Sequence, residues 1–188
     1  MSTGYQIKDQ FGLHYFTFQV VNWVDLFTRR VYKDIVIDSF KYMMDNKGFQ
    51  LFAYVIMSNH IHLLAQSIDG NLSDNIRDIK KFTSIKIIET IILTAESRKE
   101  WMLNVFKSSA SQRQTNKYYQ VWTHENHAIL IYSNKFIREK IEYIHNNPVR
   151  AGIVEKPEDY LYSSARNYAD LEAPLEIPLL FLPWHTFK

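Results

Sequence analysis

The sequence predicts an α+β domain in which helices cover an antiparallel sheet. Stretches rich in aromatic and β-branched residues indicate strands, and apolar residues repeating at the helical period indicate helices. They follow one another in the order strand, helix, hairpin, helix, strands and helix, which is typical of an α+β fold. With 188 residues, 46% of them hydrophobic, the chain can bury one core, so we expect residues 1–188 to form a single domain.

The first predicted elements are a strand and a helix. Residues 14–23, HYFTFQVVNW, are rich in aromatic and β-branched residues with rough alternation, which favours a strand. Gly48 is a suitable C-terminal cap for a helix over residues 31–47. The apolar positions of that helix are Tyr32, Val36, Phe40 and Met43.

A hairpin and a long helix come next. Residues 49–57 and 60–66 are predicted strands joined by the turn residues Ser58 and Asn59, and Asp69-Gly70 closes the hairpin. Ser73 can then cap a helix that runs to about residue 94. One face of this helix is predicted to contain Leu72, Ile76, Ile79 and either Phe82 or Thr83, and another Arg77, Lys80, Lys81 and Ser84.

The middle of the chain is more polar. Within residues 96–117 we expect a short helix through Phe106 and then a mobile loop rich in Ser, Gln and Asn. Residues 118–122 and 128–132 are predicted to form two further short strands.

The last predicted helix begins after Ser133, which can cap it, and is stopped by Pro148. A short helical piece is expected near residues 162–169, and residues 171–188 are expected to lie as an extended tail against the body. The apolar positions of the last helix are Phe136, Ile137, Ile141 and Ile144.

Composition narrows the classes of function. The chain has no cysteine, which excludes disulfides, thiolate nucleophiles and cysteine–zinc sites. Neither a signal peptide nor an apolar run long enough to span a membrane is visible, so we expect a cytoplasmic protein without a membrane partner. The formal net charge of +2 is too small to identify a nucleic-acid partner by itself.

His60 and His62 lie two residues apart in a predicted strand. On a strand, both imidazoles project from the same face, where together they can hold one divalent ion. The ordinary alternative is a pair of half-buried histidines that are satisfied by local hydrogen bonds. Further polar side chains on the last predicted helix favour the metal site over this alternative.

Tyr143 and Asn147 lie four residues apart on that helix, so they are expected to share a face with Lys140 nearby. A phenol with an ordinary pKa of about 10 is a poor nucleophile until a cation or base stabilises its phenolate, which a neighbouring metal ion can do. Each residue also has a structural alternative. Most of the 12 tyrosines must simply pack, and Asn147 can serve the helix end ahead of Pro148.

Several stretches taken together resemble the REP-associated tyrosine transposases, relatives of the single-tyrosine HUH transposases. The most specific are YIHNNPVRAG, which begins at Tyr143, and the HIH tripeptide before it. Ser58 stands where the family often has proline, a departure that leaves the histidines intact. The resemblance covers residues 14–170 through YVIMSNHIHLLAQ (54–66), KKFTS (80–84), VWTHENHAILI (121–131), IEYIHNNPVRAGIV (141–154) and KPEDYLYSSARNY (156–168).

The resemblance implies a ferredoxin-like or RRM-like sheet with the histidines on a central strand and the tyrosine on a helix beside it. It also implies a Mg²⁺ or Mn²⁺ cofactor, a 5′-phosphotyrosine intermediate and recognition of hairpins in single-stranded DNA. By position, His60 and His62 match the metal histidines, Tyr143 the nucleophile and Asn147 the third metal ligand. The predicted function is therefore a metal-dependent single-stranded DNA endonuclease and strand transferase.

Basic residues are the predicted DNA contacts, although a charged helix face is usually just solvated. His124 and His127 are expected to be structural, with a proton relay as the second interpretation. The predicted DNA-binding residues are Arg77, Lys80, Lys81, Lys140, Arg150 and Arg166.

Two other functions stay open at this point. One is a catalytically inactive protein of the same fold that binds hairpin DNA. The other is a metal-dependent hydrolase in which the histidine pair activates water. The sequence is compatible with either a monomer or a homodimer.

Overall fold

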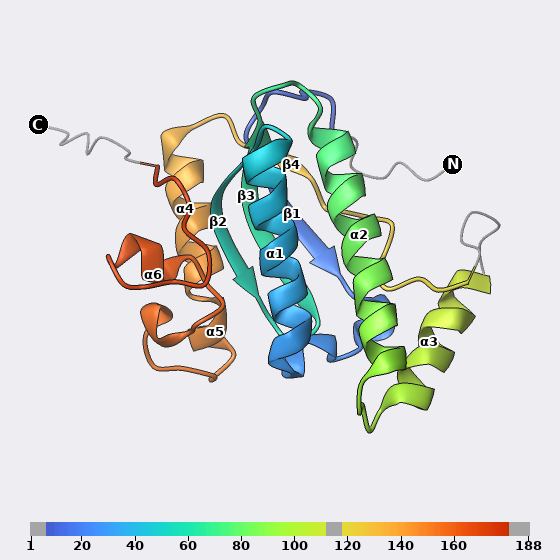
Figure 1. The fold of residues 1–188 in the computed structure, drawn as a ribbon. Helices are drawn as coiled ribbons and strands as arrows, with labels where there is room; N and C mark the ends of the chain where they lie inside the picture. The colour runs from blue at the N-terminus through green and yellow to red at the C-terminus, as the bar shows by residue number, and fades with distance from the viewer. Residues whose placement is uncertain (1–6, 112–117, 181–188) are drawn as a thin grey trace, which may run out of the picture.

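The computed structural model describes residues 7–111 and 118–180 (Figure 1). Its centre is a four-stranded antiparallel sheet with the order β2-β3-β1-β4. Together with the two helices that connect these strands, this order is the ferredoxin-like arrangement, so the predicted α+β fold class is confirmed. The strands are β1 (His14–Gln19), β2 (Phe49–Ile56), β3 (His60–Ser67) and β4 (Ile129–Leu130).

Helices cover both faces of the sheet. The crossover helices α1 (Arg30–Asn46) and α2 (Leu72–Leu93) lie side by side over one face, and α3 (Lys99–Ser111) packs beside α2 (Figure 1). Helix α4 (Asn134–His145) lies against β2 and β3, and no helix in the described ranges is long and apolar enough to cross a membrane. The short helices are η1 (Val21–Trp23), η2 (Leu26–Thr28), α5 (Asn147–Arg150), η3 (Pro157–Asp159) and α6 (Ala165–Tyr168).

Strand alternation separates an apolar face of the sheet from a partly polar one. Phe16 and Phe18 of β1 are fully buried on the side of α1 and α2. Tyr15 and Thr17 point the other way and meet His62 of the neighbouring strand. The polar groups that concern function therefore lie on the face that α4 approaches.

The predicted first strand is too long. It ends at Gln19, because Val20 makes only an isolated bridge and the chain then turns into η1. Within η1, Asn22 and Trp23 have the left-handed φ values 51° and 53°. An aromatic and β-branched pattern predicts a strand whether or not a partner strand continues beside it, so it could not locate this turn.

The two predicted short strands after residue 117 are also corrected. Residues 118–122 form no strand, since only Trp122 makes an isolated bridge. The chain instead follows β1 through a backbone hydrogen bond from Thr123 N to Gln19 O (2.8 Å). The strand predicted at 128–132 shrinks to β4, because it pairs only with the first two residues of β1.

Helix boundaries agree in part with the expectations. Ser133 caps α4 as predicted, accepting a hydrogen bond from Phe136 N (3.2 Å). Ser73 does not cap α2, which begins after Asn71; its hydroxyl accepts from Gln10 Nε2 (2.9 Å) instead. Of the two residues left open on α2, Thr83 is the buried one and Phe82 is exposed.

Two predicted helix ends lie elsewhere. Helix α3 continues past Phe106 to Ser111, and most of the loop predicted after it, 112–117, lies outside the described residues. Pro148 does not stop α4, which ends at His145; the proline sits in the first turn of α5.

The C-terminal segment borders the edge strand β2. Val55 of β2 bridges to Ser163, and the predicted helical piece near 162–169 is present as α6. Residues 171–180 contain no helix or strand, and Leu175 and Ile177 are buried; residues 181–188 of the predicted tail lie outside the described part of the chain.

A buried hydrogen bond between Thr83 and Trp122 connects α2 to the segment that precedes β4. Trp122 Nε1 donates to Thr83 Oγ1 (2.9 Å), and that hydroxyl donates to Ile79 O (2.7 Å). The Thr83→Val variant should lower the free energy of unfolding by about 1–3 kcal/mol, because the buried indole N–H loses its partner. Urea denaturation measures this. Thr90→Val, on the same helix, is the control, and an equal loss there would contradict the prediction.

Glu96 joins the start of α1 to the turn between α2 and α3. Its buried carboxylate accepts hydrogen bonds from Tyr32 Oη (2.9 Å), Arg29 Nη1 (3.2 Å) and Arg98 Nε (3.2 Å). Burial acts to raise the pKa of Glu96, but the hydrogen bonds from Arg98, Tyr32 and Arg29 outweigh it and lower this pKa to about 2.

Because the folded-state pKa of Glu96 lies below its usual value of 4.5, the stabilisation is complete above that pH and is lost as the pH falls toward 2. The free energy of unfolding should therefore drop across this range, and Glu96→Gln should make the drop shallower. Urea denaturation at a series of pH values tests this. Glu89→Gln, which alters an exposed carboxylate, should leave the drop intact.

Candidate functional site

His60 and His62 begin the central strand β3 and project from the same face of the sheet. Their ring centroids lie 4.7 Å apart. His62 is only 5% exposed, whereas His60 at the end of the strand is half-buried. The strand pairing places His62 opposite Thr17, so the pair faces the β1 side chains that also avoid the apolar core.

Neighbouring side chains engage one nitrogen of each ring. His62 Nδ1 lies 2.7 Å from Tyr15 Oη and 3.0 Å from Thr17 Oγ1. His60 Nδ1 lies 2.8 Å from Asn59 Oδ1. Such bonds orient a ring and set its tautomer, so Nε2 of each imidazole is the nitrogen suited to bind a ligand.

Both imidazoles favour the neutral form. Burial lowers the pKa of His62 to about 3, and the charges of His60, Lys140 and Arg150 act in the same direction. Burial also lowers the pKa of His60, while a hydrogen bond with Asn147 partly offsets this. Neutral imidazole is the form that coordinates metal ions, so these rings need not lose a proton to do so at neutral pH.

Helix α4 brings Tyr143 to the histidines. The Tyr143 ring centroid lies 5.3 Å from that of His62 and 6.2 Å from that of Tyr15. Ile141 and Ile144 occupy the buried stripe of the helix, which leaves Tyr143 half-buried at the margin of the core. The phenol therefore sits beside the histidine pair on the polar face of the sheet.

Asn147 also lies at this site, but on a different helix from the one that the sequence predicted. Because α4 ends at His145, Asn147 opens the separate helix α5, so the expectation of one shared helical face with Tyr143 is wrong. Its side chain is nevertheless hydrogen-bonded to His60. Residues from β3, α4 and α5 thus converge on one point of the sheet.

Two cations border this convergence. Lys140 Nζ lies 4.5 Å from the ring centroid of Tyr15 and 5.6 Å from that of Tyr143. Arg150 Cζ lies 4.8 Å from the ring centroid of Tyr143. Two positive charges beside the phenol suit an anionic ligand.

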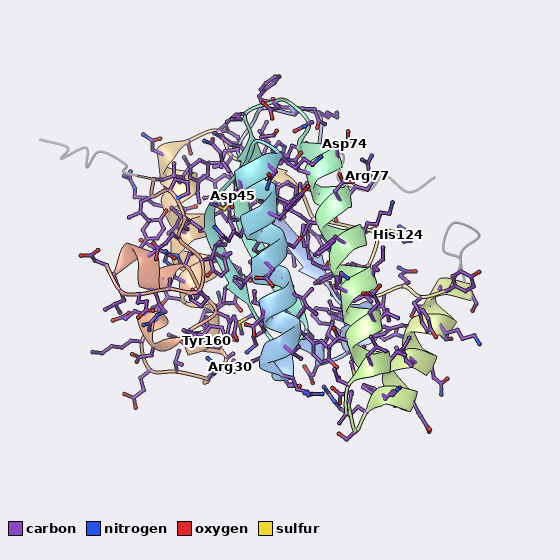
Figure 2. The ribbon with its side chains drawn as sticks, viewed as in Figure 1. Arg30, Asp45, Asp74, Arg77, His124 and Tyr160 are labelled. Carbon is purple, nitrogen blue, oxygen red and sulfur yellow. The ribbon has the colours of Figure 1, made fainter. Side chains whose placement is uncertain are left out.

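The basic residues of α2 lie on the opposite side of the sheet. Arg77 is exposed and pairs with Asp74 (2.5 Å) and Asp78 (3.1 Å); Figure 2 shows it with Asp74 near the N-terminal end of the helix. Lys80 points inward, and its Nζ donates to the carbonyl of Thr123 (2.6 Å). Burial lowers the pKa of Lys80 to about 7, which weakens its positive charge at neutral pH, and its Nζ is engaged by hydrogen bonds within the fold.

Lys81 and His124 border a cavity of about 470 Å³ between α2 and residues 119–126, and Figure 2 shows His124 beside α2. His124 is exposed, and His127 is half-buried with Nε2 3.9 Å from Glu125 Oε2. Arg166 donates to the carbonyls of Glu172 (2.6 Å) and Glu158 (2.9 Å), and so links segments near the C-terminus. Of the six predicted DNA contacts, Lys140 and Arg150 are those placed at the histidine and tyrosine cluster.

Sequence reasoning missed Tyr15, Thr17 and Asn59, which contact the imidazoles. Alternation along β1 places Tyr15 and Thr17 on one face, and that signal was available. Which β3 residues they meet depends on the strand register, which the sequence pattern does not give.

Among residues 7–111 and 118–180, no three His, Cys, Asp or Glu side chains gather in a way that could hold a metal ion. The set that converges is two imidazoles and one carboxamide. Two neutral histidines with their Nδ1 atoms engaged, together with an amide oxygen, fit a divalent ion that keeps open positions for water or substrate.

The fold of this chain resembles that of a solved relative. A solved structure of a REP-associated tyrosine transposase bound to a REP hairpin matches with a TM-score of 0.61 and 21% identity, covering 95% of this chain and 92% of that one. A second solved structure, from Deinococcus radiodurans R1, has a TM-score of 0.42 and 14% identity, covering 78% of this chain and 97% of that one. No curated protein matches the chain.

The family model described as "Transposase IS200 like" matches residues 13–120. The match includes His60 and His62 and ends before Tyr143 and Asn147. The family resemblance seen in the sequence motifs is confirmed, and the fold is shared with the REP-associated transposase. Since the model spans more than half of the sequence, the chain belongs to the family of IS200-like transposases.

Proposed function

We propose that this protein is a metal-dependent endonuclease and strand transferase that acts on single-stranded DNA at hairpin-associated sites, with Tyr143 as the nucleophile. The observation that supports this best is the 5.3 Å approach of the Tyr143 ring to His62, since these two residues are 81 positions apart in the sequence. The REP hairpin bound by the solved relative motivates the choice of substrate.

His60, His62 and Asn147 are the residues that would hold Mg²⁺ or Mn²⁺. A bound divalent ion would neutralise charge on the non-bridging oxygens of the scissile phosphate. The hydrogen bonds that the two rings make with Tyr15, Thr17 and Asn59 hold them in place, so the ligating nitrogens are positioned before any ion binds.

In the proposed reaction, the phenolic oxygen of Tyr143 attacks the scissile phosphorus in line. A bond forms between that oxygen and phosphorus while the bond to the 3′-oxygen breaks, and the phenolic proton ends on the leaving 3′-hydroxyl in the net balance. The product is a 5′-phosphotyrosine, which keeps the energy of the broken phosphodiester. A second 3′-hydroxyl can therefore reverse the step and join new DNA.

Lys140 and Arg150 would assist this step. Lys140 Nζ and Arg150 Cζ lie 5.6 Å and 4.8 Å from the Tyr143 ring centroid. Both cations are therefore close to the attacking oxygen and to the negatively charged phosphate that it attacks. Both side chains are therefore assigned to the phosphate next to the nucleophile.

The remaining basic residues are proposed to act farther from the phosphate. Arg77 and Lys81 border the cavity beside α2 and would contact the DNA backbone there. Lys80 and Arg166 would act mainly by holding the segments to which they are hydrogen-bonded. The residues proposed for the reaction, His60, His62, Tyr143 and Asn147, meet within one chain. Either a monomer or a homodimer could therefore catalyse the reaction.

A covalent-trapping experiment tests the proposal. A hairpin oligonucleotide labelled at its 3′ end is incubated with the protein and Mn²⁺, then separated on a denaturing gel. A 5′-phosphotyrosine keeps the 3′ fragment on the protein, so label should migrate with the polypeptide. Cleavage without such an adduct would favour the water-activating hydrolase, and binding without cleavage would favour the inactive binding protein.

A further inference from the structure

Trp23 is a large apolar side chain left exposed beside the histidine pair. It is 59% exposed, and its ring centroid lies 6.3 Å from that of His60 in an edge-on arrangement. The core on the other face of the sheet buries Phe16, Phe18 and Phe27 completely. The fold therefore has room for aromatic side chains but holds this one in solvent.

The backbone around Trp23 keeps it there. Asn22 and Trp23 both adopt left-handed φ values, 51° and 53°; asparagine tolerates this region, but a bulky residue such as tryptophan is strained in it. The turn is anchored to the site because Val20 N donates to Asn59 O (2.9 Å), and Asn59 directly precedes His60. The buried side chains of Val21 and Val24 fix it on both sides. Strain of this kind persists where the surrounding structure over-determines the conformation, often at functional sites.

We propose that Trp23 is a stacking platform for one unpaired nucleobase of single-stranded DNA next to the scissile phosphate. This inference rests on the proposed function and names a substrate contact for it. The indole offers a flat face that stacks with any base, so the contact positions the strand without selecting its sequence.

The position of Trp23 indicates how far the stacked base lies from the scissile phosphate. Ring contacts run from Tyr143 to His62 (5.3 Å), from His62 to His60 (4.7 Å) and from His60 to Trp23 (6.3 Å). A strand whose phosphate lies at Tyr143 and the histidines therefore has a base within a few nucleotides of Trp23. The arrangement outlines a path for the strand, from the cations Lys140 and Arg150 beside Tyr143 to the indole beside His60.

The test is a double-mutant cycle between Trp23 and single nucleotides. Binding is measured by fluorescence anisotropy in the Tyr143→Phe background, so that cleavage does not intervene. Trp23→Ala should weaken binding of a hairpin with a single-stranded flank by roughly 5- to 150-fold, and Trp23→Phe by less. Abasic nucleotides are then placed one at a time along the flank. At one position the abasic DNA should bind Trp23→Ala and the parent protein equally well.

Trp101→Ala is the matched control, because Trp101 of α3 is 53% exposed and lies outside the ring series. If Trp23→Ala binds every oligonucleotide as the parent does, or if its loss is the same at all abasic positions, the inference is overturned. The outcome is separate from that for the proposed function, which fails if the unaltered protein, with Trp23 in place, forms no covalent adduct.

Discussion

Replacing Tyr143 with phenylalanine should abolish the covalent protein–DNA adduct and leave hairpin binding unchanged. The substitution removes only the hydroxyl, while the ring that packs near His62 and Tyr15 is retained. Without the phenolic oxygen no bond to phosphorus can form, so the loss should be complete. The 3′-labelled hairpin assay on a denaturing gel measures the adduct, and anisotropy measures binding.

Tyr42→Phe is the control for this variant, because Tyr42 is an exposed tyrosine on α1, on the other side of the sheet. It should form the adduct at the rate of the unaltered protein. Cleavage by Tyr143→Phe at an undiminished rate would remove Tyr143 as the nucleophile and leave water as the attacking group.

The second large effect is expected for His62→Ala. His62 is buried and neutral, and two hydroxyl groups orient it through Nδ1, so the substitution removes a fixed imidazole from the proposed metal site. Removing a side chain that hydrogen-bonds to a metal ligand typically weakens metal binding about 10- to 100-fold. Removing the ligand itself should weaken metal binding further. Calorimetric titration with Mn²⁺ should show no saturable site, and the adduct should disappear with it.

The control for the metal titration is His124→Ala, since His124 is exposed and lies beside α2 (Figure 2). It should retain one saturable Mn²⁺ site. Because His62 is buried, the thermal unfolding of His62→Ala must also be followed, and His60→Ala at the half-buried position provides a second variant. A folded His60→Ala protein that binds Mn²⁺ as tightly as the parent would contradict the assignment.

Much of the fold could be predicted because its strands and helices carry strong periodic patterns. The hairpin of β2 and β3 and the helices α1 and α2 lie within one or two residues of their predicted bounds at most ends. The histidine pair was therefore placed correctly on one face of a strand. The prediction failed for weaker elements whose structure depends on strand pairing, as at residues 118–122, where only Trp122 makes an isolated bridge, to Val20.

The inner contacts of the site depended on tertiary packing. The inward turn of Lys80 toward Thr123 follows from the path of residues 121–126 along β1, which no local pattern encodes. The same is true of the Tyr15 and Thr17 contacts with His62, which require the observed register of β1 on β3. Neither feature can be obtained from residue spacing, because spacing describes one element at a time.

The sequence by itself determined the α+β class, the shared face of His60 and His62, and the family resemblance around Tyr143. Only the tertiary structure decided that Tyr143, Asn147 and the histidines meet, that α4 ends before Asn147, and that Trp23 stays exposed beside them. The physical reason is that periodicity fixes which side of an element a residue occupies. Distances between elements are set by strand register, helix packing and turns, which arise only when the whole core is formed.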